Sequence, residues 1–380
     1  MHKHSRVAIT ASSLAAVALA ASACSSSSKS SGSGTTPSTG GSTSAAGTAS
    51  GKVQVGVILP DTTSSARYTQ YDAPLLTKAF QTAGIKADVQ NAQGDNSKFV
   101  SIAQSMISEG VKVLLIDPAD PATGISVESS AKSAGIQVID YDRVNLGGSA
   151  AYYVSYDNED VGKLQATALL TCLGAKPKPA IIELNGGTDI DNNAILFKAG
   201  AHSVLDPAVK DGKVTISQEV DVSKWDNTTA ATDFTQLLTK AGGKVDGVLA
   251  ANDGIAGAAI GNLKAKNLTV PVTGQDASIQ GLQYILSGDQ CMTVFKDVSK
   301  EADAASKLAI ALAKGDDATA KSLATGTLKD PKGNRDIPSV LLVPEAITKA
   351  NIKDVITAGA VTVADLCKGV TAACTAAGIS

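Results

Sequence analysis

The sequence is poor in the residues on which many enzyme sites are built. Its 380 residues include three histidines and thirteen aromatic residues, of which seven are tyrosine, five are phenylalanine and one is tryptophan. Because His2 and His4 lie at the N-terminus, His202 alone is left for a folded domain, so a His-based triad or a His-rich metal site lacks material. Phosphate-binding glycine loops and calcium-loop motifs are also absent from the sequence. The sequence therefore predicts no metal and no cofactor, and places His202 on a helix surface.

Charge is nearly balanced, which excludes another class. The chain has 33 Lys and Arg against 36 Asp and Glu, for a formal net charge of −3. A nucleic-acid surface normally shows a basic excess with clustered Lys and Arg, so no nucleic-acid partner is expected. The length suits two medium-sized domains that share a sizeable core.

The N-terminal segment has the composition of an export signal. Residues 1–6 are basic, residues 7–20 are apolar and small, and Ala21-Ser22-Ala23 precedes Cys24. Residues 1–23 are therefore predicted to be a secretory signal peptide, too short for a membrane span. This junction resembles the lipobox of bacterial lipoproteins, in which the cysteine is lipidated, although Ala21 stands where leucine is preferred. The alternative is ordinary cleavage after Ala23, which leaves Cys24 free.

Residues 24–51 and the remainder of the chain differ sharply. The first part is rich in Ser, Gly and Thr and is predicted to be a flexible tether. From residue 52, short apolar runs alternate with amphipathic stretches, which is typical of an α/β fold with parallel sheets. The runs occupy residues 53–59, 86–92, 111–117, 136–142, 152–157, 179–184, 214–220, 245–253, 270–276, 292–296 and 339–344. We expect two doubly wound lobes in residues 52–380, with a boundary near 143–152 and a second crossing near 276–300.

Polar residues gather where these runs end. They are Asp142-Arg143, Asp157-Asn158, Asn252-Asp253, Gln275-Asp276 and Lys296. Ligands of open parallel sheets bind beyond the carboxyl ends of the strands, so this set is expected to line a cleft between the lobes. Each Asp or Asn taken singly is equally well explained as a helix N-cap.

This mixture of side chains suits an uncharged sugar. Carboxylates accept hydrogen bonds from hydroxyl groups, whereas Arg, Lys and Asn donate to the hydroxyl oxygens. The scarce Tyr68 and Trp225 lie beside polar residues in predicted loops, where they are candidates to stack on a sugar ring. Packing at the rim of the core is the alternative. A glycoside hydrolase would need two carboxylates at a defined separation, and the sequence does not place such a pair.

Several blocks together resemble one family. SSARYTQYD, GIQVIDYDRV, YYVSYDNEDVGKLQA, DIDNNAILFKAGA, LAANDGIAGAAI, VTGQDASIQG and MTVFKD cover most of residues 53–355. They are similar to type I periplasmic sugar-binding proteins of ABC importers, and in particular to the xylose binders. The resemblance implies two lobes joined by a hinge and sugar contacts from Arg67, Tyr68, Asp142, Arg143, Asp191, Asn193, Trp225, Asn252, Asp276 and Lys296. Tyr68 stands where the xylose binders have Trp, and the PDTTSSARY loop is closer to related binding proteins that serve aldose sensing and uptake.

The resemblance implies a function without catalysis. The protein is expected to capture xylose or a related aldose outside the cytoplasm and to deliver it to an ABC permease, while Cys24 anchors the chain to the membrane. A sensor that presents the bound sugar to a receptor kinase uses the same closed form and remains an alternative. A LacI-type regulator would need a helix-turn-helix where this chain has its signal and tether.

Four cysteines remain besides Cys24. Cys172, Cys291, Cys367 and Cys374 allow three pairings in an oxidising compartment. Their spacing favours Cys367 with Cys374, which leaves Cys172 with Cys291, and buried free thiols are the alternative. No CxxC redox or zinc motif is present, so these disulfides would have a structural role.

Overall fold

The computed structural model describes residues 52–379, and its first lobe is built on a seven-stranded sheet. The strand order is β10-β11-β5-β4-β3-β1-β2, and all neighbours are parallel except β10 and β11. The strands are β1 (Val55–Leu59), β2 (Ala87–Asn91), β3 (Val113–Ile116), β4 (Gln137–Tyr141), β5 (Tyr152–Tyr156), β10 (Gly326–Asp330) and β11 (Arg335–Leu342).

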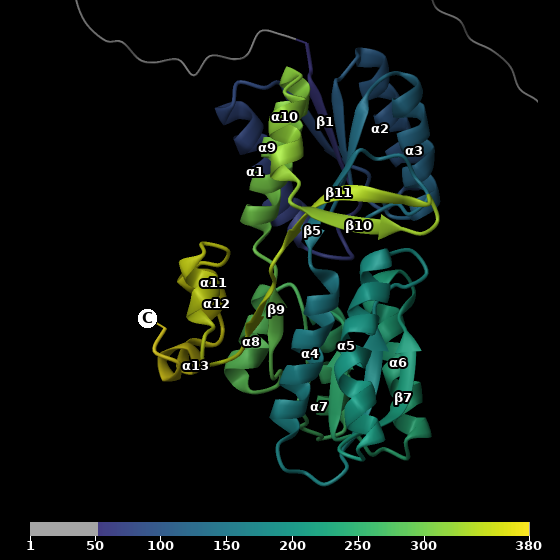
Figure 1. Ribbon diagram of the computed structural model, residues 1–380. Helices are drawn as coiled ribbons and strands as arrows, with labels where there is room; N and C mark the ends of the chain where they lie inside the picture. Colours follow the sequence, from purple (N-terminus) through teal and green to yellow (C-terminus); the bar gives the residue numbers. More distant parts are fainter. Residues whose placement is uncertain (1–51, 380) are drawn as a thin grey trace, which may run out of the picture. The chain divides into compact units, whose positions relative to one another are not determined.

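Both faces of this sheet are covered, which explains why its central strands β1 and β3 are apolar throughout. In β1, Val55 and Val57 pack with α1 and α9, whereas Ile58 packs with α2 and α3 on the other face. Figure 1 shows α9 and α10 on one side of the sheet and α2 and α3 on the other. The helices are α1 (Ala73–Thr82), α2 (Asn96–Glu109), α3 (Pro121–Ser133), α9 (Val298–Lys314) and α10 (Asp317–Leu323).

The second lobe has a sheet with strand order β7-β6-β8 and a separate antiparallel pair, β9 and β12. Two isolated parallel bridges, Val248 with Val272 and Gln275 with Val294, connect the two sheets through the segment 270–276. The strands are β6 (Ala180–Asn185), β7 (Thr215–Asp221), β8 (Gly247–Ala250), β9 (Thr293–Phe295) and β12 (Glu345–Ile347).

Helices also cover this lobe on two sides. Leu169 of α4 and Leu205 of α5 pack against Ile181 of β6, whereas Phe234 of α6 and Ile255 of α7 pack in the cluster that contains Ile182. The helices are α4 (Asn158–Leu173), α5 (Asn192–Lys210), α6 (Asn227–Lys240), α7 (Asp253–Ala265) and α8 (Ile279–Ser287).

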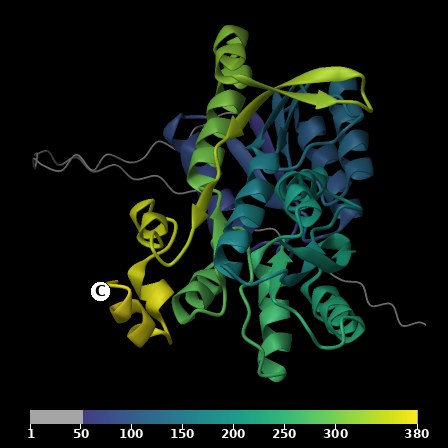
Figure 2. The same cartoon turned by 60° about the horizontal axis from the view of Figure 1, so that its bottom comes forward.

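The C-terminal part of the chain forms three short helices beside α8. They are α11 (Lys353–Thr357), α12 (Val363–Cys367) and α13 (Thr371–Ala376). Their apolar residues share a core cluster with Leu282, Ile285 and Phe295. Both views show this segment at the side of the second lobe (Figures 1 and 2).

The chain crosses between the lobes three times. The crossings lie at Asp157 between β5 and α4, at Lys296-Asp297 between β9 and α9, and at Val343-Pro344 between β11 and β12. Because β5 belongs to the first sheet, the first crossing lies after Tyr156, a few residues beyond the expected range of 143–152. The second falls within 276–300, and the third has no counterpart in the sequence analysis.

Ten of the eleven predicted runs overlap strands of the structure. The exception is the run 270–276, which makes only the two isolated bridges, so its prediction as a full strand is wrong. Two strands were not predicted: β10 is a partly exposed edge strand with the sequence GTLKD, and β12 has only three residues. No helix within residues 52–379 combines the length and the apolar character required to span a bilayer.

Candidate functional site

The ten residues named from the sequence all lie around one pocket between the lobes, here called the central pocket. Four further residues line it as well, and of these the sequence analysis named only Gln275, as a residue expected in the cleft. The full lining is Ser64, Ser65, Arg67, Tyr68, Asp142, Arg143, Asp191, Asn193, Phe197, Trp225, Asn252, Gln275, Asp276 and Lys296.

Arg67 is held at one wall of the central pocket by buried carboxylates. Its Nε and Nη2 donate to the two oxygens of Asp72 at 2.9 and 2.8 Å, and Nη2 also donates to Glu301 Oε2 at 2.6 Å. Its Nη1 donates to Asp142 Oδ1 at 3.2 Å. Burial raises the pKa of Glu301 to about 7 despite the nearby guanidinium. This bidentate arrangement fixes the Arg67 side chain, so that little conformational entropy is lost when a ligand binds.

Asp142 stands at the end of β4 in an unusual conformation. Its φ of 60° lies in the left-handed region, and its carbonyl oxygen accepts from Tyr153, Ser155 and Asn193 at 2.8 to 3.0 Å. Tyr68 donates its hydroxyl to Asp142 Oδ2 at 2.8 Å. Although burial opposes ionisation, the cations around it hold the pKa of this carboxyl well below its usual range. Asp142 is therefore an ionised acceptor whose backbone strain the three donors compensate.

Arg143 lies between two acids and above the ring of Tyr68. Its Nε is 3.8 Å from Asp117 Oδ1 and 3.4 Å from Asp191 Oδ2, and its guanidinium carbon is 5.7 Å from the Tyr68 ring centroid. Asp117 is fully buried at the end of β3, and neither of its carboxylate oxygens has a hydrogen-bond partner in the described chain. Burial raises the pKa of Asp117 well above its ordinary value.

An aromatic corner forms the second-lobe wall of the central pocket. Trp225 donates its indole N–H to Asp191 Oδ2 at 3.1 Å, and its ring meets Phe197 edge-on with centroids 6.2 Å apart. The indole lies directly against Gly186: a Cβ added there would stand 2.6 Å from Trp225 Cζ3 and closer still to two neighbouring ring carbons. Gly186 therefore provides the space that the indole occupies.

Several contacts join the lobes around the central pocket. Asn193 of α5 donates to the Asp142 carbonyl and accepts from Tyr153 of β5 at 3.0 Å. Ser65 of the first lobe donates to Asp276 Oδ2 of the second lobe at 3.5 Å. Lys296, at the second crossing, lies 4.0 Å from Asp142 and 3.8 Å from Asp276. With the Arg143–Asp191 pair, these contacts hold the lobes together in a closed form.

Capping and pocket lining are combined at two positions. Asp191 accepts from the backbone of Asn193 at the start of α5, and Asn252 accepts from the backbone of Ile255 at the start of α7. Asp142 and Asp276 cap no helix, and both have positive φ angles. For Asn252, where the sequence left capping and pocket lining as alternatives, both explanations are therefore correct, and Asp191 has the same two roles.

The expected loop positions of the two aromatics need correction. Tyr68 begins a short π-helical turn, η1 (Tyr68–Asp72), and Trp225 ends a 3₁₀ turn, η2 (Ser223–Trp225). Both side chains are buried, with 2% and 5% of their surface exposed. Each side chain packs in an apolar cluster and donates a hydrogen bond to an aspartate, Tyr68 to Asp142 and Trp225 to Asp191. Both therefore belong to the wall of the pocket and not to an exposed surface loop.

The overall chemistry of the central pocket is that of a neutral, polar binding site. Three cations, Arg67, Arg143 and Lys296, face three carboxylates, those of Asp142, Asp191 and Asp276, so their formal charges cancel. Its donors and acceptors and its aromatic corner suit a polyhydroxylated ligand. The volume of the pocket is only about 30 Å³, so the lobes must move apart to admit a sugar ring.

Of the additional lining residues, the sequence analysis placed Gln275 in the cleft but missed the other three. Ser64 and Ser65 closely precede the recognised Arg67, so this neighbour offered a signal. Phe197 lies within an apolar helical pattern and looks like a core residue. Asp117 lies close to Arg143, behind the pocket. It ends an apolar run, as Asp142 does, and this position in the sequence is the signal that could have identified it.

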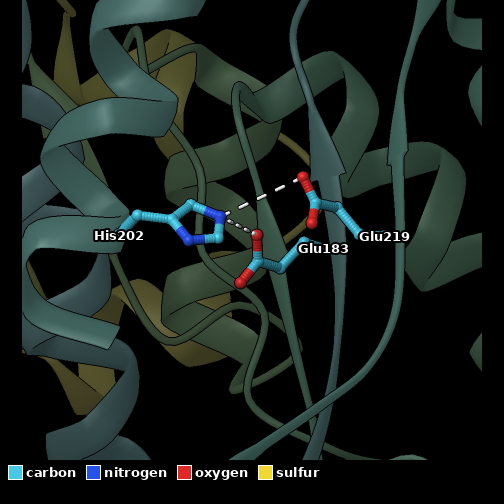
Figure 3. Close-up of side chains that lie close together, drawn as sticks. All are labelled: Glu183, His202 and Glu219. Atoms are coloured by element: carbon cyan, nitrogen blue, oxygen red, sulfur yellow. Dashed lines mark hydrogen bonds and ion pairs between the residues drawn. The ribbon is translucent and has the colours of Figure 1, made fainter. Parts of the chain in front are cut away.

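A polar cluster away from the central pocket contains His202 (Figure 3). His202 Nε2 faces Glu183 Oε2 at 3.2 Å and Glu219 Oε1 at 4.0 Å, and Nδ1 lies 2.8 Å from Asp206. Three potential metal-ligand atoms thus come within 4.8 Å of one another, but Lys198 already pairs with Glu219. We interpret the cluster as an ion-pair network. His202 is on a helix, as expected, although 24% of its side chain is exposed.

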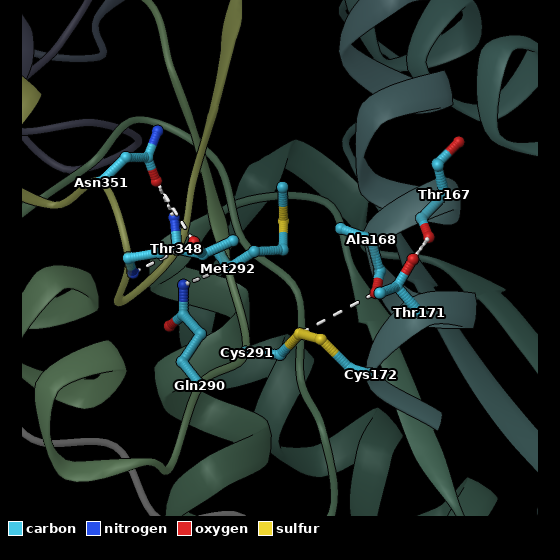
Figure 4. Close-up of a disulfide and its surroundings, with 10 residues drawn as sticks. Thr167, Ala168, Thr171, Cys172, Gln290, Cys291, Met292, Thr348 and Asn351 are labelled. Carbon is cyan, nitrogen blue, oxygen red and sulfur yellow. Dashed lines mark hydrogen bonds between the residues drawn. A yellow bond between two sulfur atoms is a disulfide. The ribbon is translucent and has the colours of Figure 1, made fainter. Parts of the chain in front are cut away.

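The structure contains two disulfides, which are the pairs that the spacing favours. Cys172–Cys291 connects the end of α4 to the segment before β9 (Figure 4), and Cys367–Cys374 connects α12 to α13. The first spans 119 positions of the sequence and the second spans 7. Cys24 lies outside the described residues.

Comparisons with known sequences agree with this architecture. The family described as "Periplasmic binding protein domain" matches residues 55–317. The D-xylose-binding periplasmic protein of Escherichia coli is 37% identical over 289 residues, which cover 76% of this chain and 84% of that protein. The multiple sugar-binding periplasmic receptor ChvE of Rhizobium radiobacter is 35% identical over 338 residues, which cover 84% and 94% of the two chains.

Solved structures give the same result for the fold. A carbohydrate transporter solute-binding protein from Chloroflexus aurantiacus in complex with D-glucose superposes with a TM-score of 0.75 at 31% identity. The alignment covers 82% of this chain and 97% of that one. An ABC transporter solute-binding protein from Clostridium phytofermentans with bound β-D-glucose has the same TM-score and identity, with coverages of 82% and 99%.

Proposed function

The chain belongs to the periplasmic binding protein family, and from this membership we propose that it captures a monosaccharide in the central pocket and delivers it to an ABC permease. It acts outside the cytoplasm and binds without catalysis. Xylose or a related aldose is the proposed ligand, because similarity to the xylose binders extends over most of the chain.

The observation that carries the proposal is the composition of the central pocket. Its three cations and three carboxylates offer charge-assisted hydrogen bonds to hydroxyl groups while their formal charges cancel. Trp225 and Phe197 supply an apolar corner for the C–H face of a sugar ring. A charged substrate would leave this balance uncompensated, and an apolar one would leave the polar groups without partners.

The three crossings support a mechanism of hinged closure. In the open form, Arg67, Asp142 and Arg143 would receive the sugar on the first lobe. Rotation at Asp157, Lys296-Asp297 and Val343-Pro344 would then bring up Trp225, Asn252 and Asp276 from the second lobe. The contacts of Asn193 with Asp142 and of Arg143 with Asp191 stabilise the closed form, which the permease would recognise.

We assign the sequence before the folded body to export and anchoring. Residues 1–23 are proposed to be a signal peptide, and residues 24–51 a tether from a lipidated Cys24 to the binding domain in residues 52–380. Metabolic labelling with a radioactive fatty acid tests this assignment. Label that appears in the wild type and is lost in Cys24→Ala is expected, and equal labelling of both would contradict it.

Sugar binding itself is tested by a thermal-shift screen followed by calorimetry. A ligand that binds only the folded form raises the melting temperature by mass action. The panel is xylose, arabinose, ribose, glucose, galactose and fucose. We expect at least one of these aldoses to raise the melting temperature and to bind in calorimetry, whereas no response to any of them would refute the proposal.

We propose a sensor role for this protein as the second candidate, because one similar protein is named a receptor. A sensor would present the closed form to a receptor kinase in place of a permease. Uptake of the radiolabelled sugar in cells with and without the protein separates the two roles. Transport predicts that uptake at low sugar concentration is lost with the protein, whereas a pure sensor leaves uptake intact when the permease is expressed independently.

A further inference from the structure

A second and larger cavity, here called the outer cavity, adjoins the central pocket. Its volume is about 550 Å³, within the range of roughly 300–1,000 Å³ that is typical of small-ligand sites. The loop and helix at 62–78 form its first-lobe wall, and residues 252–254 and 276–280 form its second-lobe wall. Residues 295–299 at the second crossing and residues 358–360 of the C-terminal segment complete it.

The two cavities share part of their walls. Six residues line both: Ser64, Ser65, Arg67, Asn252, Asp276 and Lys296. Among them, Ser65 and Asp276 approach from opposite lobes, and their hydrogen bond of 3.5 Å is at the limit of a normal one. Asp276 also has the most exposed carboxylate of the central pocket, at 18% against 7% for Asp142. The partition between the cavities is therefore weak at this point.

The lining of the outer cavity matches a second neutral sugar. It contains three basic residues and three aspartates, of which Arg67, Lys296 and Asp276 are shared with the central pocket. Tyr71 and Phe295 supply aromatic surface, and Asn227, Ser278 and Gln280 supply uncharged hydrogen-bonding groups. The C-terminal segment contributes only Ala358, Gly359 and Ala360, whose small side chains leave the volume free.

We propose that the outer cavity receives a second sugar ring, so that the protein accepts a disaccharide whose first ring occupies the central pocket. The inference rests on the proposed sugar-binding function and extends its substrate class. The linkage between the rings passes between Ser65 and Asp276, where an oxygen of the ligand replaces their long hydrogen bond. The second ring then lies between Tyr71 and the loop 276–280.

Calorimetry with matched pairs of sugars tests the proposal. The probes are xylose with xylobiose, and glucose with cellobiose and maltose. We expect at least one disaccharide to bind within tenfold of its monosaccharide or more tightly. If a monosaccharide binds and all three disaccharides fail to bind within a hundredfold of their monosaccharides, the inference is wrong. If none of the monosaccharides or disaccharides binds, the proposed function itself fails.

A substitution that fills the outer cavity gives the second test. Ala360→Trp should weaken disaccharide binding at least tenfold and change monosaccharide affinity less than twofold. The matched control is Ala350→Trp, because Ala350 is exposed and lies outside the cavity lining. Monosaccharide binding that equals the wild type shows that a variant is folded. If Ala360→Trp does not fold, Gln280→Trp repeats the test by filling the opposite wall of the outer cavity. Equal disaccharide affinity in the wild type and in a folded filled variant would overturn the inference.

Discussion

The contact between Gly186 and Trp225 predicts that one added methyl group weakens sugar binding. In Gly186→Ala the new Cβ would stand 2.6 Å from Trp225 Cζ3, whereas carbon atoms normally pack at about 3.5–4.0 Å. The indole must therefore move by about 1 Å or more, away from the glycine. Gly186 is outside the left-handed region, so the backbone itself accepts alanine.

The displacement has a cost that the structure allows us to estimate. The displaced indole loses its packing against the sugar ring, and an aromatic contact of this kind contributes about 0.5–1.5 kcal/mol. Since every 1.4 kcal/mol is about tenfold in affinity, we expect the sugar Kd to rise about 2- to 10-fold. The fold should survive, because overpacking of this size typically costs about 1–3 kcal/mol.

Intrinsic fluorescence is the natural assay, because Trp225 is the only tryptophan in the chain. A sugar that binds the wild type should change its emission, and Gly186→Ala should shift the ligand-free spectrum and reduce the response. Gly261→Ala is the matched control, since a Cβ added at this position of α7 meets no atom within 4 Å. A Gly186→Ala variant with wild-type Kd and spectrum would refute the assigned position of the indole.

Three further substitutions test other parts of the structure. Asp276→Ala should weaken sugar binding at least tenfold with unchanged circular dichroism, and unchanged calorimetric affinity would remove this residue from the site. Burial raises the pKa of Glu183 to about 7, so the folded state holds the proton of this carboxyl more tightly than the unfolded state does. The resulting contribution to the free energy of unfolding is full below about pH 4.5 and is lost as the pH rises through 7. Between pH 5 and 8 the wild type should therefore lose up to about 3 kcal/mol of stability relative to Glu183→Gln, as measured by urea unfolding, and parallel pH profiles would contradict this. The double variant Cys172→Ser, Cys291→Ser should lose about 2–5 kcal/mol of stability but keep its sugar affinity within twofold; equal stability would show that the long disulfide contributes little.

The fold could be predicted where local pattern and burial agree. Strands β1 and β3 are buried on both faces, so they read as continuous apolar runs. The segment 270–276 has the same apolar character but pairs only at Val272 and Gln275, because its neighbours are a short strand on each side. Pairing depends on partners distant in sequence, which a single run does not reveal.

The pocket could be predicted where residues stand at recognisable chain positions. Asp142, Asn252 and Asp276 follow apolar runs, and Arg67 and Trp225 lie in blocks that resemble the family. The support behind the pocket could not be predicted, because Asp72 and Glu301 come from different helices and meet only through Arg67. The cluster at His202 was invisible for the same reason, since its carboxylates come from β6, β7 and α5.

The strand pairs beside the three crossings limit how the two lobes can move relative to each other. On the first-lobe side, Tyr156 pairs with Leu342 just before two of the crossings, and on the other side Phe295 pairs with Glu345. The Cys172–Cys291 disulfide then connects α4, which follows the first crossing, to the segment before β9. Because these connecting segments are paired with one another, we expect the lobes to move mainly by rotation about one axis. A single distance measured between two labels, one on each lobe, should therefore describe most of this motion.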